Sequence, residues 1–190
     1  MNTEQIVTEQ LIDLINKYLS NNKLHTDYYY KAFNKAYCCY QNLNNKILIA
    51  EKKQSKDYYQ LDILICKDTE KLSEVEPLVI IEVKNKGYTS HDIIVYSDKA
   101  KRHKILYPHI KYGFVVINSK QPLSYKYFSH AENFDFAYLL DVDDKHDVGY
   151  FIENILVKEI EDAEYRKKLL YSKTRQKLKG YRLNFEKINS

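Results

Sequence analysis

Two apolar segments of the chain carry charged side chains that could do chemistry together. Asp62 lies inside the run YYQLDILIC at 58–66, and Glu82 and Lys84 end the run LVIIEVK at 78–84. The second run is unbroken and β-branched, which is typical of a central strand buried on both faces. A charge buried against a sheet costs several kcal/mol unless it is paired or binds a cation. These three charges therefore call for a partner or a function.

The alternation of side chains along a strand predicts how these charges face. Glu82 and Lys84 are two residues apart, so they point to the same side of their strand. Asp62 is predicted on the face opposite an apolar set formed by Leu61, Ile63 and Ile65. One carboxylate from each strand can then meet the other in space.

Two such carboxylates and a lysine suit metal-assisted hydrolysis of a phosphodiester. That reaction needs a cation to offset charge on the phosphoryl oxygens, and a positioned, activated water. Asp62, Glu82 and the backbone carbonyl of Val83 supply the hard oxygen ligands that Mg²⁺ prefers, and Mn²⁺ can substitute. Lys84 can orient the attacking water or stabilise developing negative charge.

A purely structural alternative exists for the same residues. Glu82 and Lys84 could form an ion pair where their strand emerges, with Asp62 as an ordinary edge residue. The pattern ExK alone is weak because it occurs by chance in many strands. Its place at the end of a buried strand, after a matching strand with an aspartate, favours the catalytic interpretation.

On these motifs the chain resembles the PD-(D/E)xK nuclease superfamily. The resemblance covers about 46–118 and rests on the strand YYQLDILIC, the strand VIIEVK and the segment YPHIKYGFVVIN. Leu61 stands where the motif has proline, at a position that is tolerant in the superfamily. The resemblance implies a restriction-endonuclease-like core with a helix across the sheet, Mg²⁺ as the metal, and Asp62, Glu82 and Lys84 as catalytic residues.

Many members of that superfamily also have an acid upstream of these motifs. Glu51 is one candidate, because a hairpin with its turn near Ser55 and Lys56 would bring it to the same side as Asp62. Glu9, on the first expected helix, is the competitor.

The rest of the chain predicts an α/β fold with a mixed central sheet flanked by N-terminal and C-terminal helices. We expect one nuclease domain over 1–190, with its core at about 46–118 and a basic helical segment at about 150–190. Helices are expected at 3–20, at 27–40, where aromatic residues step by three and four, at 91–106 and at the end of the chain. Strands are expected at 46–52 and 58–66, forming a hairpin, and at 78–84, 111–118 and 134–140.

Composition excludes several classes of protein. Apolar residues make up 44% of the chain and charged residues 29%, which is ordinary for a packed globular protein and excludes a disordered one. With only four glycines, the chain has no glycine-rich loop for a nucleotide cofactor. It lacks a signal-peptide pattern and a long apolar segment, so we expect a cytoplasmic protein without a membrane partner.

The basic residues are unevenly distributed and predict a polyanionic partner. The segment 165–190 carries nine basic residues and one acid, for a charge of +8, against −4 for 1–164. Residues expected to contact the backbone of double-stranded DNA are Lys99, Lys101, Arg102 and Lys104 on one helix, and Arg166 and Lys167 near the C-terminus.

Together these features predict a Mg²⁺-dependent endonuclease, favoured as a type II restriction endonuclease that cuts double-stranded DNA at a specific sequence. Symmetric cutting of two strands favours a homodimer. One alternative is a repair or junction-cleaving nuclease of the same fold. The other is a nucleic-acid-binding module that keeps the fold without catalysis.

Overall fold

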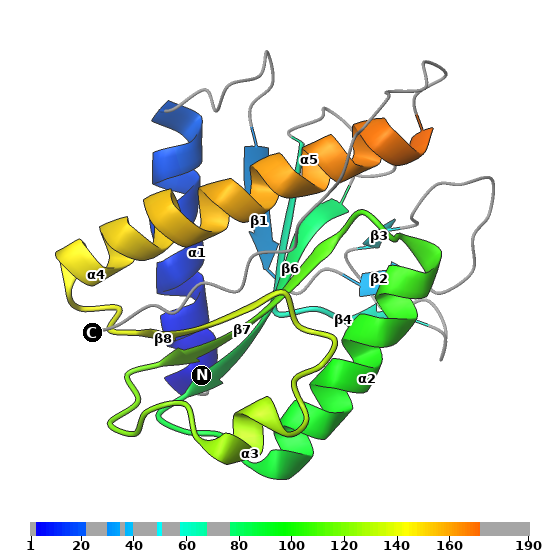
Figure 1. The fold of residues 1–190 in the computed structure, drawn as a ribbon. Coiled ribbons are helices and arrows are strands. Elements are labelled where there is room, and N and C mark those ends of the chain that lie inside the picture. The colour runs from blue at the N-terminus through cyan, green and yellow to red at the C-terminus, as the bar shows by residue number, and fades with distance from the viewer. Residues whose placement is uncertain are drawn as a thin grey trace.

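A five-stranded mixed sheet forms the centre of the molecule (Figure 1). The computed structural model describes residues 3–21, 30–34, 37–39, 49–50, 58–67 and 77–171. The strand order is β1-β5-β6-β7-β8, with bounds β1 Tyr30–Asn34, β5 Ile63–Lys67, β6 Pro77–Asn85, β7 Lys111–Ile117 and β8 Phe136–Leu140. Strands β1, β5 and β6 pair antiparallel, whereas β6, β7 and β8 pair parallel. The expected α/β fold with a mixed sheet flanked by helices is confirmed.

Strand β6 is central because its side chains are apolar on both faces. Val79, Ile81 and Val83 pack in one core cluster with residues of the N-terminal helix α1 (Thr3–Asn21) and the C-terminal helix α5 (Val157–Tyr171). Ile80 packs on the other face, in a cluster that includes Ala100 of helix α2 (Ser90–Leu106). The sheet is therefore covered by α1 and α5 on one side and by α2 on the other.

Local sequence explains where α2 begins. Thr89 accepts a hydrogen bond from the backbone of Asp92 through its hydroxyl, and the Asp92 carboxylate accepts one from the backbone of Thr89. This reciprocal capping box satisfies amide groups that the first helical turn leaves unpaired. The short helix α3 (Tyr125–Phe128) lies beside the start of α2, where the backbone N–H of Ser124 donates to the hydroxyl of Tyr88.

The C-terminal helices follow one another without a break. Helix α4 (Lys145–Tyr150) leads into the π-helical segment η2 (Phe151–Leu156), which leads into α5. Val148, Ile152, Leu156 and Ile160 are all buried in the core cluster on the α1 side of the sheet. Among the described residues, no helix is long and apolar enough to span a membrane.

The prediction of a helix at 27–40 is wrong. The described part of this segment forms β1 and the short strand β2 (Tyr37–Cys39). Tyr30 and Ala32 of β1 face the α1 side, and Phe33 packs on the α2 side, which is the alternation of a strand. Pairing with β5 over five residues therefore overrides the helical spacing of the aromatics.

The prediction of a hairpin formed by 46–52 and 58–66 is also wrong. A small second sheet has the order β3-β2-β4, so β2 lies between β3 (Ile49–Ala50) and β4 (Tyr58–Gln60). The run at 58–66 is in addition split, because β4 belongs to this sheet and β5 to the large one. The expected strands at 78–84, 111–118 and 134–140 are confirmed as β6, β7 and β8, and the helices at 3–20 and 91–106 as α1 and α2.

Gly113 of β7 gives a test of this packing. A Cβ atom built on Gly113 would lie 2.1 Å from a ring carbon of Phe136, whereas one on Gly149 of α4 would meet nothing within 4 Å. We expect Gly113→Ala to lower the free energy of unfolding by about 1–3 kcal/mol through overpacking. Gly149→Ala should raise it by roughly 0.5–1 kcal/mol because alanine favours a helix. Urea unfolding of both variants checks the pair, and an unchanged midpoint for Gly113→Ala would contradict the assigned packing.

Candidate active site

Asp62 occupies a bend between β4 and β5. Leu61 packs in the cluster on the α2 side with Leu64, whereas Ile63 packs on the α1 side. The prediction that Leu61 shares a face with Ile63 is therefore wrong, because the bend interrupts the alternation. The bend turns the Asp62 carboxylate toward β6, where Oδ2 accepts a hydrogen bond of 2.9 Å from the backbone N–H of Val83.

Glu82 is the buried acid of the site, with a residue exposure of 1%. Its Oε1 lies 2.6 Å from Nζ of Lys99 on α2 and accepts a hydrogen bond of 2.7 Å from the hydroxyl of Tyr112 on β7. The Lys99 ammonium also donates to the backbone carbonyl of Gln60. Both contacts of Glu82 use Oε1, so within the described part of the chain Oε2 remains available for a cation.

The two carboxylates are close enough to influence each other. Burial, and after it the negative charge of Glu82, raise the pKa of Asp62 to about 7, against the lowering effects of the Val83 N–H and Lys99. A neighbouring like charge disfavours ionisation, so the pair lacks full compensation despite Lys99. The expected meeting of Asp62 and Glu82 in space is therefore found in the structure.

Lys84 points to the same side of β6 as Glu82, as predicted, and its ammonium is held by α2. Nζ of Lys84 lies 3.3 Å from Oδ1 of Asp92 and 5.2 Å from the ring centre of Tyr96. Burial lowers the pKa of Lys84, but a hydrogen bond with Tyr96 and the charges nearby outweigh it and raise this pKa above its ordinary value. Lys84 therefore remains a cation at neutral pH.

Helix α2 contributes side chains to the cluster that were not predicted to lie there from the sequence. Asp92, Tyr96 and Lys99 are spaced by four and three residues, which places them on one face of the helix. Burial raises the pKa of Tyr96, and its ring centre lies 5.2 Å from Nζ of Lys84 and 5.7 Å from Nζ of Lys99, so Tyr96 lies near both lysines of the cluster. The periodic signal was present in the sequence, but it was not connected to the strands.

The acid of α1 that acts on the site is Glu4, which was missed. Its charge raises the pKa values of both Asp62 and Lys84. Glu9, the candidate proposed from the sequence, accepts a hydrogen bond from Gln5 on its own helix. Glu51 lies outside the described residues, and the hairpin that was to bring it to Asp62 does not form between β3 and β4.

The lysines expected to contact DNA on α2 divide into two groups. Lys99, with 8% exposure, is buried against Glu82, so its expected place on a DNA-contacting surface is wrong. Lys104 donates to the carbonyl of Asn133 and pairs with Asp135 at 2.6 Å, which holds it against the protein. Lys101 and Arg102 lie on the exposed face of the helix, and their contact with DNA stays a prediction.

The two residues expected to contact DNA on α5 are remote from this cluster. Glu164, two residues before Arg166, pairs at 3.1 Å with Lys67, the last residue of β5, which lies beside the beginning of β6. Glu82 is five residues further along β6, or about 17 Å at the rise of a strand. The structure therefore does not bring Arg166 and Lys167 to the cluster.

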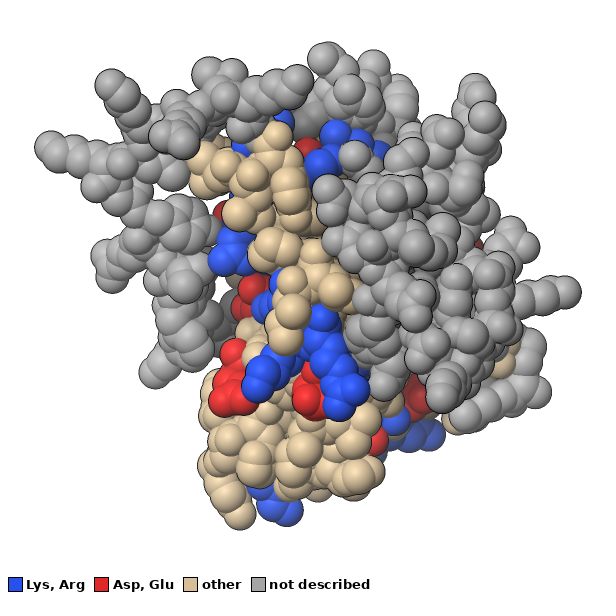
Figure 2. Space-filling model, turned by 90° about the vertical axis from the view of Figure 1, so that its right-hand side faces the viewer, with Lys and Arg blue, Asp and Glu red and all other residues tan. Residues whose placement is uncertain are grey.

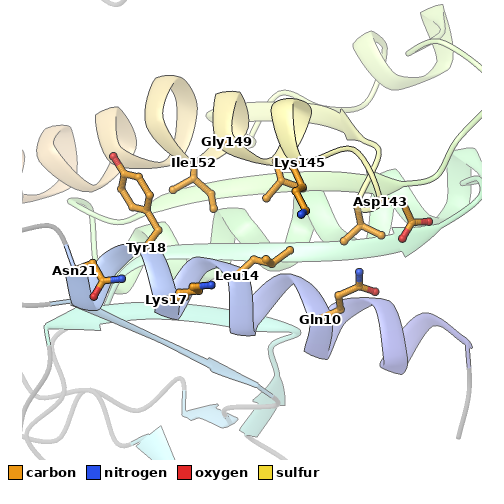
Figure 3. A pocket seen from close by; sticks show the side chains of 11 residues that line it. Gln10, Leu14, Lys17, Tyr18, Asn21, Asp143, Lys145, Gly149 and Ile152 are labelled. Atoms are coloured by element: carbon orange, nitrogen blue, oxygen red, sulfur yellow. The ribbon is translucent and has the colours of Figure 1, made fainter.

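A hollow of about 430 Å³ lies between α1 and α4, on the other side of the sheet from Glu82 (Figure 3). Its lining includes the apolar side chains Leu14, Val148 and Ile152 and the charged side chains Lys17, Lys145 and Asp143. It has one carboxylate and no second one to share a cation, so the chemistry of Asp62 and Glu82 has no counterpart there.

The donor set at the cluster consists of two carboxylates and one carbonyl. In the described ranges, no group of three or more His, Cys, Asp or Glu side chains could hold a metal ion. The third ligand would be the backbone carbonyl of Val83. The N–H of Val83 points to Asp62, and the C=O of a strand residue points to the same side as its N–H. These are hard oxygen ligands, which fit Mg²⁺ or Mn²⁺.

No family model, curated protein or solved structure matches the chain.

The pKa of Asp62 predicts a pH-dependent stability. The folded-state pKa of about 7 exceeds the ordinary 3.8, so the free energy of unfolding falls as pH rises from about 4 to about 7 and Asp62 ionises. Asp62→Asn keeps an acceptor for the Val83 N–H and removes this charge. With a metal chelator present, we expect the variant to be more stable than the wild type by roughly 2–4 kcal/mol at pH 8, with no such gain near pH 4. Urea unfolding across pH measures it, and a gain independent of pH would contradict the assignment.

Proposed function

We propose that the chain is a Mg²⁺-dependent endonuclease of the PD-(D/E)xK type that hydrolyses phosphodiester bonds of DNA. The observation that carries the proposal is the convergence of Asp62 and Glu82, with Lys84 on the same side of β6 as Glu82. The mixed α/β sheet, with a helix crossing the face that bears these residues, is the arrangement that the sequence resemblance implied.

Asp62, Glu82 and the carbonyl of Val83 would hold the metal. The raised pKa of Asp62 supports this assignment, because it indicates negative charge that the protein leaves incompletely compensated. When bound, the cation offsets charge on the phosphoryl oxygens and lowers the pKa of a water molecule. The hydrogen bond from the Val83 N–H fixes Asp62, and Tyr112 fixes Glu82, so both carboxylates are oriented before any ligand arrives.

Lys84 serves as a fixed cation rather than as a base. Its raised pKa keeps the ammonium protonated at neutral pH, so it can donate hydrogen bonds to the attacking water or to a phosphoryl oxygen. Asp92 and Tyr96 position that ammonium, and Asp92 is itself held by the capping box of α2. The start of α2 thereby sets the place of the lysine relative to the two acids.

Sequence-specific cutting of double-stranded DNA by a cytoplasmic restriction enzyme is the finer form of this proposal. Digestion of a mixed DNA library with Mg²⁺, followed by sequencing of the ends, tests it. Discrete ends support a restriction enzyme, and random ends contradict it. Preference for branched or damaged DNA would favour the repair alternative.

One observation favours a second candidate, a nucleic-acid-binding module without catalysis. The Lys99 ammonium already pairs with Glu82 at 2.6 Å, which is the role that a metal would otherwise fill in part. Binding of Mn²⁺ to the purified chain, followed by electron paramagnetic resonance, separates the two. Binding that Asp62→Asn abolishes supports the nuclease, and the absence of binding supports the second candidate.

Lys84 gives the sharpest test of catalysis. We expect Lys84→Met to lower the cleavage rate by about 10²–10³-fold, because the fixed charge acts on the transition state. Lys86→Met is the matched control, since Lys86 is an exposed lysine two residues further on.

Asp62→Ala and Glu82→Ala should abolish cleavage, and so should EDTA, whereas Ca²⁺ should support it poorly because it holds its ligands loosely and at longer distance. Normal cleavage by folded Lys84→Met, or in excess chelator, would rule out the mechanism.

The basic end of α5 is expected to add affinity for DNA without setting the sequence that is cut. Each phosphate neutralised contributes about −0.9 to the slope of log K against log salt, so Arg166→Ala/Lys167→Ala should flatten that slope by roughly 2. The competing account is that these residues only complement the helix dipole and nearby acids such as Asp162, which lies 4.0 Å from Arg166. An unchanged slope with a lowered melting temperature would favour that account.

A further inference from the structure

The solvent-exposed face of helix α2 carries a regular pattern of aliphatic and charged residues. Its exposed residues form one stripe, and three of them are large aliphatics with exposures of 48% for Ile94, 45% for Val95 and 72% for Ile105. Single exposed aliphatics are common on proteins. Three on one helical face, interleaved with charges, are typical of a surface that meets another helix.

The stripe has the spacing of a coiled-coil seam. Ile94, Asp98, Lys101 and Ile105 are separated by four, three and four residues, which is the alternation of a and d positions in a heptad. At 100° per residue the four side chains fall within about 60° of arc. Their order is aliphatic, acid, base, aliphatic, so the stripe keeps its pattern of apolar ends and charged middle when it is reversed.

We propose that a second copy of this chain packs on this face, with its α2 antiparallel to the first. A two-fold axis crossing the helix pair between Lys99 and Ala100 would place Ile94 against Ile105 of the second copy, and Asp98 against its Lys101. Each contact occurs twice, as an isologous interface requires. The result is an isoleucine pair at either end and two opposite-charge pairs between them.

The charges select this orientation. A parallel pairing in register would set Asp98 against Asp98 and Lys101 against Lys101, and like charges in contact oppose assembly. Within one chain, Oδ2 of Asp98 accepts a hydrogen bond of 2.8 Å from Nε of Arg102. The other oxygen, Oδ1, is the atom that would meet the lysine of the second copy.

Helix α3 extends the apolar part of the surface. Its residues Tyr125 and Phe128 are 75% and 60% exposed, and α3 lies beside the first turns of α2. In the antiparallel pair, the end of the second copy's α2 passes over this region. Figure 2 views the side of the molecule on which α2 lies in Figure 1, and it shows a mostly uncharged area at the lower end with charges of both signs above it.

The size of the surface predicts a weak dimer. Two helices of 17 residues pair over about 25 Å. Even with α3 the contact stays at the lower end of the roughly 1,200–2,000 Å² of stable interfaces, so assembly is expected at micromolar concentrations. The residues that face Glu82 lie on the other side of α2, so the interface leaves the candidate active site uncovered and does not depend on the proposed function.

Sedimentation of the full chain from about 1 µM to about 100 µM tests the proposal in the concentration range of such weak interfaces. The mass should rise with concentration toward twice the chain's 22.7 kDa. Ile105→Glu should keep the chain monomeric throughout. Leu170→Glu is the matched control, an aliphatic of 51% exposure on α5, and it should dimerise like the wild type. A monomeric wild type, or a dimer that tolerates Ile105→Glu, overturns the proposal.

Charge reversal tests the antiparallel register. Lys101→Glu and Asp98→Lys should each weaken the dimer about 10-fold or more, because each brings like charges together twice. The double variant should recover most of that loss, and failure to recover overturns the register. These side chains are exposed, so melting curves are expected to stay close to that of the wild type. If the wild type is monomeric and Lys101→Glu instead weakens DNA binding, the stripe is a DNA contact and the proposal is overturned.

Discussion

The carboxylate of Glu82 is the constraint on which the arrangement depends. An acid with 1% exposure on a central strand must be compensated from every side that can reach it. Lys99 reaches it from α2 and Tyr112 from β7, so the ion pair and hydrogen bond fix helix and strand relative to β6. Breaking such a buried pair typically costs 3–5 kcal/mol, which is a large share of the stability of one domain. The candidate site is therefore complete only when α2 is packed on the sheet.

The same helix divides its charges between two surfaces. Asp92, Tyr96 and Lys99 face the sheet, while Asp98 and Lys101 face outward. The charges of Asp92 and Lys99 are paired with Lys84 and Glu82, and these contacts fix the positions of the side chains. Exposed charges on the outward face are screened by water, so they can select a partner without strongly affecting the stability of the chain.

Much of the fold could be predicted from local sequence, because β6 and β7 are apolar runs of strand length and α1 has the apolar periodicity of a helix. The elements that were predicted wrongly are those whose structure is decided by pairing between distant segments. The segment 27–40 has helical spacing of aromatics, yet β1 is a strand because β5 offers it five antiparallel partners. Likewise, β2 separates β3 from β4, and no local signal indicates an intervening strand. At the site, alternation correctly placed Glu82 and Lys84, but Lys99 and Glu4 come from other elements, and their approach depends on packing.

The π-helical segment η2 explains how one continuous helix covers a twisted sheet. Val148, Ile152, Leu156 and Ile160 recur every four residues and all lie in the same core cluster. In a straight α-helix a four-residue step advances by about 40° beyond a full turn, so these side chains would drift by about 120° around the axis. A π turn takes more residues than an α turn and rotates the later part of the helix back toward the sheet. The segment acts as a phase correction, because side chains spaced by four residues stay on one face only where the helix is wound more loosely than an α-helix.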